Sequence, residues 1–250
     1  MFAVVFFVVV ALCASAGCMA KSPIDPAPEK VESTIELEHT AVALPTTTGT
    51  FVTLASYVQV SGITGLDKVN DVLKALVTND QQVTIASYAK IDAGTVRYHV
   101  AVDPALISGS SKIVSLLMPV DVDPSDGVGG SYWLAATMSV PTAQPVQLVD
   151  LFVSPLSAVT TLTRLAKAHV RTETSDCFRD SLDEEFASTR VWSELSTFGT
   201  FALLPAGLVI GFSKYQIAPG ACSATKVLIP WVELADAMTE SANHLVSDLR

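Results

Sequence analysis

The sequence predicts an α+β fold with mainly antiparallel sheets and packed helices. Segments of helical period alternate with segments of strand character, and no regular strand–helix–strand order connects them. Turn residues separate neighbouring strand segments, which indicates hairpins rather than crossover connections. We expect two small subdomains behind an N-terminal signal or lipoprotein leader and a flexible tether.

The composition indicates a folded protein and argues against a nucleic-acid partner. The 250 residues include 15 Lys and Arg against 25 Asp and Glu, which gives a formal net charge of −10, and 50% of them are hydrophobic. This length and apolar content allow a sizeable core and exclude disorder for most of the chain. Phosphate binding depends on Lys and Arg, so no nucleic acid is expected as a partner.

The N-terminus, residues 1–20, has the pattern of a secretory signal peptide. An uninterrupted apolar run at 2–12 is followed by small residues. A signal-peptidase site of the A-x-A type ends at Ala16, whereas the four residues that end in Cys18 resemble a bacterial lipobox, in which Cys18 would be acylated. An uncleaved membrane anchor is the third alternative, because the stretch is just long enough to span a bilayer. We expect an extracytoplasmic protein, anchored by lipid to the cell membrane or secreted.

Export would place the remaining cysteines in an oxidising compartment. Cys177 and Cys222 form an even pair there, and a disulfide between them would close a loop of about 45 residues. Two buried free thiols are the alternative. No C-x-x-C occurs, and the four cysteines with the scattered histidines make no zinc motif.

A flexible tether is predicted over 21–50, which is rich in Pro, Glu, Ser and Thr, with one short strand near 33–44. An N-terminal α+β subdomain is expected over 51–115. It contains an amphipathic helix over 65–77. The apolar side chains at helical spacing there are Leu66, Val69, Val72, Leu73, Leu76 and Val77.

Two hairpins are predicted after this helix. Strands at 82–91 and 95–103 flank an Asp-Ala-Gly turn, which suits a short hairpin connection. Strands at 112–122 and 131–140 flank an acidic turn that contains Pro and Gly.

The C-terminal part begins with a helix over 156–170, followed by an acidic helical segment over 178–195. A further hairpin is predicted over 201–215, with Pro-Ala-Gly as its turn. A last strand at 227–230 and a C-terminal helix over 231–249 complete the chain.

No catalytic motif assembles in this sequence. The G-x-S-x-G, H-E-x-x-H and Walker-A patterns are absent. The S-x-x-K matches at 87–90 and 223–226 lack the partner motifs of β-lactamase-type sites. The acidic stretch at 121–127 does not have calcium-loop spacing. We therefore expect no catalytic residue, no metal and no cofactor. Candidate anchors of a binding surface, for each of which core packing is the alternative, are Trp133, Trp192, Tyr215 and Trp231.

The segment 201–238 carries a family pattern of a strand, a glycine turn, a second strand, a small-residue stretch and a strand ending in Ile-Pro before a short helix. The positions that fit this pattern are Phe201, Gly207, Phe212, Tyr215, Ile217, Pro219, Ile229, Pro230 and Leu234. On these residues the segment resembles the C-terminal domain of RsiV-like proteins (domain of unknown function 3298), which also occurs in a mycobacterial secreted immunogenic protein. Upstream, Tyr132 stands where the family usually has His, which weakens the idea that a histidine acts there.

The resemblance implies an RsiV-like C-terminal domain at 116–240, followed by the end of a C-terminal helix at 241–250. It also implies an extracytoplasmic pair of α+β domains. RsiV uses this ectodomain to bind lysozyme, so the implied partner is a cationic extracellular protein such as lysozyme.

The function that we expect is that of an exported, lipid-anchored cell-envelope protein without catalytic activity, which acts as a binding or antigen-like module. One alternative is a lysozyme-binding sensor or inhibitor like the RsiV ectodomain. Another is an envelope hydrolase that acts on glycan or lipid, which needs convergent catalytic groups in a cleft. A lipid-binding carrier would need an apolar cavity of roughly several hundred Å³.

Overall fold

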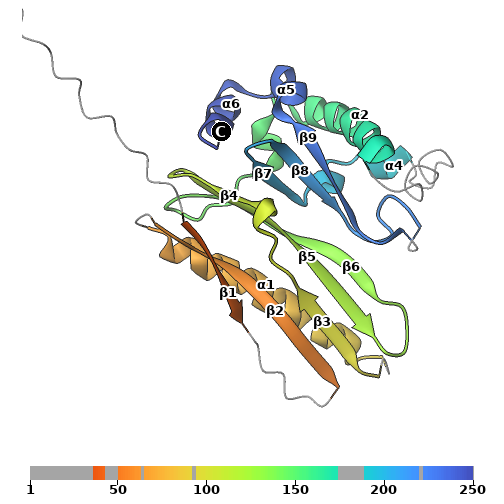
Figure 1. Cartoon of the computed structure of the whole chain (residues 1–250). Helices are drawn as coiled ribbons and strands as arrows, with labels where there is room; N and C mark the ends of the chain where they lie inside the picture. The colour runs from red at the N-terminus through yellow and green to blue at the C-terminus, as the bar shows by residue number, and fades with distance from the viewer. Residues whose placement is uncertain are drawn as a thin grey trace, which may run out of the picture. The chain divides into compact units, whose positions relative to one another are not determined.

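The computed structural model describes residues 36–42, 50–62, 65–91, 94–173, 189–219 and 222–249. All of them belong to one compact unit, which spans Ser33–Arg250. Within this described part the architecture is α+β, with two separate sheets and helices packed on them, as predicted (Figure 1).

The larger sheet has six strands in the order β1-β2-β3-β5-β4, and β6 pairs with the other edge of β5 (Figure 1). All of its pairs are antiparallel except β2 with β3. The strands of this sheet are β1 Glu36–Val42, β2 Phe51–Ser61, β3 Val96–Val100, β4 Ile107–Gly109, β5 Ile113–Pro124 and β6 Gly130–Ser139. The β5–β6 pair confirms the hairpin predicted over 112–140, and β5 runs across the subdomain boundary predicted at residue 115.

Helix α1 spans Asp67–Tyr88 and connects the parallel strands β2 and β3. The strand predicted at 82–91 was therefore wrong, and so was the hairpin with 95–103. The β-branched residues Val83, Thr84 and Ile85 suggest a strand locally. Burial follows the helical period instead, because the helix continues to pack on the sheet through Gln81 and Thr84.

The smaller sheet has three antiparallel strands in the order β7-β8-β9. These strands are β7 Phe201–Leu204, β8 Gly207–Phe212 and β9 Thr225–Pro230. Helix α2, at Pro155–Glu173, lies on the outer side of this sheet (Figure 1). The predicted helix at 156–170, the hairpin at 201–215 and the last strand are confirmed.

Short helical segments complete the described part of the chain. They are α4 Thr189–Trp192, α5 Trp231–Leu234, α6 Glu240–Ser247, and the 3₁₀ segments η1 Pro104–Leu106, η2 Leu148–Leu151, η3 Leu195–Phe198 and η5 Ala235–Ala237. The continuous helix predicted over 231–249 was wrong, because Met238 is extended and forms a bridge with Phe152. The chain then restarts a helix at Thr239, whose side chain caps α6 by accepting from the Ala242 N–H. Most of the acidic segment predicted over 178–195 lies outside the described residues.

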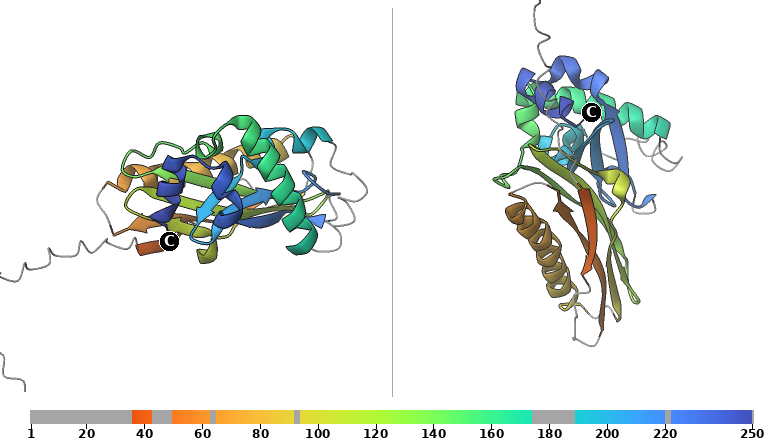
Figure 2. Two further views of the ribbon diagram at one scale, coloured as in Figure 1. Left: turned by 90° about the horizontal axis from the view of Figure 1, so that it is seen from above. Right: turned by 60° about the vertical axis from the view of Figure 1, so that its left-hand side comes forward.

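Alternation along β5 separates two faces of the larger sheet. Val114, Leu116 and Met118 pack with the buried face of α1, which covers one face of the sheet (Figure 2). Leu117, which lies between Leu116 and Met118 on β5, packs with Val209 of the smaller sheet. The larger sheet therefore lies between α1 and the smaller sheet, since successive side chains of a strand point to opposite faces.

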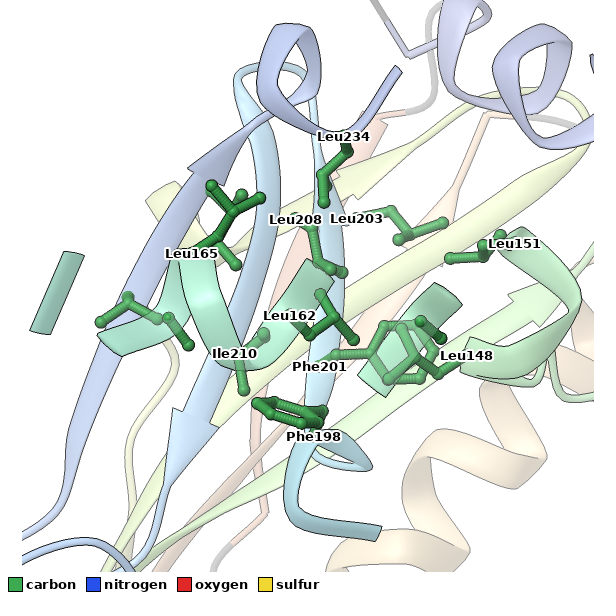
Figure 3. Close-up of a cluster of buried hydrophobic side chains, with 14 of the residues drawn as sticks. Leu148, Leu151, Leu162, Leu165, Phe198, Phe201, Leu203, Leu208, Ile210 and Leu234 are labelled. Atoms are coloured by element: carbon green, nitrogen blue, oxygen red, sulfur yellow. The ribbon is translucent and has the colours of Figure 1, made fainter. Parts of the chain in front are cut away.

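The outer face of the smaller sheet packs against α2. Leu208 and Ile210 of β8 share a buried cluster with Leu162 and Leu165 of the helix, and Phe198 lies beside them (Figure 3). The described chain thus has four layers in the order α1, larger sheet, smaller sheet, α2.

Polar and aromatic contacts fix the two sheets against each other. Ser115 Oγ on β5 accepts from the Leu203 N–H of β7 at 2.7 Å. Trp133 of β6 donates from Nε1 to the Thr225 carbonyl at 2.9 Å. The Trp133 ring lies so close to Gly211 that a Cβ there would come within 2.7 Å of the indole Cγ. A glycine at this position of β8 is therefore needed for the close approach of the indole ring.

Candidate functional site

The clearest concave feature of the described residues is a groove with a volume of about 410 Å³. We call it the edge groove. Its lining residues are Val72, Leu76, Ala135, Ala136, Thr137, Met138, Ala143, Pro145, Val146, Gln147, Gly199 and Phe201. They come from α1, β6, the loop after β6, the end of η3 and the start of β7.

The position of the groove follows from the layers. Val72 and Leu76 belong to α1 on one face of the larger sheet, whereas Gly199 and Phe201 belong to the layer on the opposite face. A groove that touches both layers and β6 must lie along the outer edge of β6. The strand order agrees, because β6 pairs only with β5 among the described strands.

One wall of the groove is made by the loop that folds back onto β6. The Ser139 N–H donates to the Gln144 carbonyl at 2.9 Å, and the Val146 N–H donates to the Thr137 carbonyl at 2.8 Å. These two bonds place 144–146 beside the C-terminal end of β6. The loop thus covers the C-terminal end of the β6 edge, and the preceding residues of that edge line the groove.

A second hollow of about 210 Å³ continues the edge groove. It shares Gln147, Gly199 and Phe201 with the first. It extends along η2 and η3, where its other lining residues are Leu148, Val149, Leu195 and Ser196.

The chemistry of the groove is apolar and uncharged. No ionisable side chain lines either hollow. The Thr137 hydroxyl is buried and hydrogen-bonded to Ser115 Oγ at 2.7 Å, while Gln147 is exposed at the rim. The groove therefore suits an uncharged apolar ligand, oriented by a few polar contacts.

A polar cluster under α1 is the most chemically distinctive set of side chains elsewhere. Tyr98 and Tyr132 each donate from their hydroxyl to Asp80 Oδ2 at 2.7 Å, and Thr84 Oγ1 lies 3.2 Å from the Tyr132 oxygen. Gln81 Nε2 donates to Thr53 Oγ1 at 2.7 Å beside them. Together these bonds dock the C-terminal half of α1 on the larger sheet.

Their surroundings keep the hydroxyls of both tyrosines protonated at neutral pH. Burial, and in addition the neighbouring Asp80 carboxylate, raise the pKa of Tyr98 and of Tyr132 above the usual value for a phenol. Both hydroxyls therefore stay protonated and serve as hydrogen-bond donors. Tyr132, which stands where the resembling family has His, has this docking role here.

The predicted modification sites are only partly described. Cys18 and Cys177 lie outside the described residues, and Cys222 is buried at 8% exposure in the cluster beneath α2. Acylation of Cys18 and the Cys177–Cys222 disulfide therefore remain predictions.

The residues that carried the family resemblance lie mainly in the core and turns of the smaller sheet. Phe201 and Phe212 are buried, and Pro219 is half-buried. A Cβ on Gly207 would come within 2.2 Å of the Ile229 carbonyl oxygen of β9, so only glycine allows this strand approach. Two further positions lie outside the core: Tyr215 is 57% exposed with a positive φ of 69°, and Pro230 precedes α5 as its N-cap residue.

The four histidines do not come together. His39, His99, His169 and His244 lie on β1, β3, α2 and α6 respectively. His169 Nε2 lies 3.2 Å from Glu233 Oε1 of α5. Within the described ranges no group of three His, Cys, Asp or Glu side chains is placed to hold a metal ion. The helices of these ranges are also too short or too polar to cross a membrane.

Three of the four candidate aromatic anchors pack in the interior. Trp192 and Trp231 are buried at 2% and 4% exposure, and Trp133 joins the two sheets. The edge groove itself was not predicted. A signal for it exists in the helix predicted over 65–77, whose apolar set is wider than one buried stripe. Val72 and Leu76 are the apolar residues that lie outside the buried stripe, one turn apart at its border.

Comparisons with known proteins confirm the DUF3298 part of the resemblance found in the sequence. Residues 149–232 match the model of a protein family of unknown function, DUF3298. A solved DUF3298 family structure from Bacteroides fragilis is 13% identical, with a TM-score of 0.53 over 88% of this chain and 98% of that chain. A solved DUF3298 family protein from Pseudomonas aeruginosa is 10% identical, with a TM-score of 0.48 over 84% and 96% of the two chains. No curated protein gives a significant match.

At this identity the Bacteroides structure shows a shared fold and no more. The matched residues cover α2, the smaller sheet and the start of α5. Residues 149–232 of this chain therefore form a DUF3298 domain.

Proposed function

We propose that this chain is an exported, lipid-anchored cell-envelope protein without catalytic activity, and that it acts as a binding module through the edge groove. The observation that carries the binding role is a solvent-open apolar groove with no ionisable side chain in its lining. Its volume of about 410 Å³ lies within the range of small-molecule and cofactor pockets.

The wall of the groove on α1 supports this role. Val72 is 41% exposed, although it lies at the rim of an apolar hollow, and Leu76 next to it is half-buried. Exposed apolar side chains that border a concave site leave water when a ligand binds, which favours binding.

The binding role can be tested with an uncharged apolar dye, N-phenyl-1-naphthylamine, whose fluorescence rises in apolar surroundings. We expect the purified protein to bind the dye, and we expect Val72→Arg to abolish the binding. The matched control is Val83→Arg, on the same helix at 65% exposure but outside the groove, which should bind the dye as the wild type does. Absence of dye binding by the wild type, or an equal loss of dye binding in both variants, would overturn the proposed binding role of the groove.

Export and lipidation have support from the sequence of residues 1–20 alone. The intact mass of the protein from the membrane fraction distinguishes an acylated Cys18 from a cleaved or an uncleaved leader. The same measurement, with and without reduction and alkylation, counts the thiols that a Cys177–Cys222 disulfide would protect. A full-length mass in the membrane fraction would overturn the lipoprotein proposal.

A lysozyme-binding sensor or inhibitor is a second candidate, favoured by the charge of the protein. The net charge is −10, and Asp121, Asp123 and Asp126 are exposed along β5 and the turn after it. An acidic surface speeds association with a cationic protein more than it strengthens the complex. Calorimetric titration with lysozyme at low salt tests this candidate, and absence of binding there would eliminate it. This second candidate also depends on the resemblance to RsiV-like proteins.

A further inference from the structure

The edge groove is lined by β6 from Ala135 to Met138, and Trp133 precedes this stretch on the same outer edge of the strand. The Ser139 N–H and the Thr137 carbonyl bond to the returning loop and not to β5. In an antiparallel pair, the main-chain groups of alternate residues point to the same side of the strand. The N–H and C=O groups of Trp133 and Ala135 therefore also point away from β5.

The partner strand gives an independent check of this assignment. Pro119 of β5 stands opposite Trp133, and its carbonyl accepts from the Ala101 N–H on the other side of β5 at 3.1 Å. Pro119 thus directs its main chain away from β6. The Pro119–Trp133 pair is consequently a non-hydrogen-bonded pair of the ladder, as the register requires.

Neighbouring segments occupy both ends of this edge. The Ser131 carbonyl accepts from the Lys214 N–H at 2.8 Å, and the Val146 N–H bonds to Thr137. Between these two contacts, no main-chain partner stands opposite Trp133 and Ala135 in the part of the chain that the structure describes. A strand edge without a partner strand is a template for a further strand.

We infer that the edge groove binds an extended segment of another polypeptide, which adds to the larger sheet as a strand beside β6. A polypeptide main chain presents donors and acceptors with the spacing that the free groups of Trp133 and Ala135 require. This inference rests on the proposed binding role of the groove and names the class of its ligand.

The lining of the groove defines the side chains of this segment. Alternate side chains of an added strand would point toward Val72 and Leu76 on one face and toward Phe201 on the other. Because no ionisable residue lines the groove, the segment carries apolar, uncharged side chains at these positions, and a buried charge would lack a partner there.

The test uses the full chain and acetylated, amidated heptapeptides in which Thr alternates with Ala, Val, Leu or Phe. Calorimetric titration measures their binding, and amide hydrogen exchange reports protection at Trp133 and Ala135. We expect at least one peptide of the set to bind and to slow exchange at both amides. Val72→Arg should abolish this binding, and the control Val83→Arg should retain it.

Two N-methylated versions of the best peptide separate strand addition from simple apolar binding. One version is methylated on the Thr amides and the other on the alternate amides. In a bound strand only one of these sets faces β6, so one version should bind about tenfold or more weakly while the other binds as the parent does. An equal effect of both methylations, or no effect of either, would overturn strand addition.

The outcomes also distinguish this inference from the proposed function. If the dye binds and none of the peptides does up to millimolar concentration, the groove remains a binding site and strand addition is wrong. If neither dye nor peptide binds, both proposals fail.

Discussion

The two long helices of this protein cover chemically different surfaces. Beneath α2 lies a large cluster of buried apolar side chains, which includes three rings in mutual contact, with Phe212 5.8 Å from Trp192 and 6.4 Å from Phe198 between ring centroids. Beneath the C-terminal half of α1 the buried contacts are polar, and two tyrosines share Asp80 Oδ2. Helix α2 is held by the burial of apolar surface, whereas the C-terminal half of α1 is held by directional hydrogen bonds.

This difference predicts how the packing beneath each helix responds to mutation and to pH. Apolar burial contributes stability in proportion to area and is insensitive to pH, so damage beneath α2 should scale with the volume removed. A buried polar cluster contributes little net stability while it is complete, but it is costly when one partner is removed. The three predictions below can break or sharpen this contrast.

The largest effect is expected from Phe212→Ala. The side chain is fully buried and lies between two aromatic rings, so its removal leaves a cavity in the core beneath α2. We expect the free energy of unfolding in urea to fall by about 3–5 kcal/mol. The control Val232→Ala, at a side chain 83% exposed, should change it by less than about 0.5 kcal/mol. A loss below about 1 kcal/mol for Phe212→Ala would contradict a tightly packed core.

A smaller but specific effect is expected from Asp80→Ala. The substitution removes the acceptor that Tyr98 and Tyr132 share. Tyr132 keeps Thr84 as a partner, whereas the buried Tyr98 hydroxyl loses its acceptor, which should cost about 2 kcal/mol. Asp71→Ala, at an exposed carboxylate on the same helix, is the matched control and should be nearly neutral. Tyr98→Phe in the Asp80→Ala background should recover part of the loss, because it removes one unsatisfied donor. If Asp80→Ala and Asp71→Ala are equally mild, the cluster does not dock α1.

The smallest effect at neutral pH, and the one specific to the α1 side, is a loss of stability in alkali. The folded state holds the pKa of Tyr98 above its usual value, while in the unfolded chain it titrates near pH 10. Below about pH 10 the phenol is neutral in both states, and its contribution is fully present. As the pH rises further, the unfolded chain releases this proton and the folded chain keeps it. The free energy of unfolding then falls by up to about 1.4 kcal/mol per pH unit.

Urea titrations between about pH 8 and pH 11 measure this slope. Tyr98→Phe should make the decline shallower, whereas Phe212→Ala should lower the curve without changing its slope. A slope that Tyr98→Phe leaves unchanged would show that other groups cause the alkaline loss.

The elements that local patterns determine were predicted well. The β5–β6 and β7–β8 hairpins each join adjacent strands through turn residues that favour a reversal, so their pairing depends little on the rest of the molecule. The second half of α1 was missed because Val83, Thr84 and Ile85 favour a strand locally. Its helical state depends on polar contacts with β2, β3 and β6, which no local pattern reveals.

By itself, the sequence determined the α+β class, the DUF3298 resemblance and an N-terminal export pattern, because each rests on residues close together in the chain. The tertiary structure decided the edge groove and the Asp80 cluster, because their side chains come from several separate segments; Asp80 and Tyr132, for example, are 52 residues apart. Turn and periodicity rules describe interactions of neighbours along the chain. A groove at a sheet edge exists only once the order of the strands, and the layers on both faces of the sheet, are established.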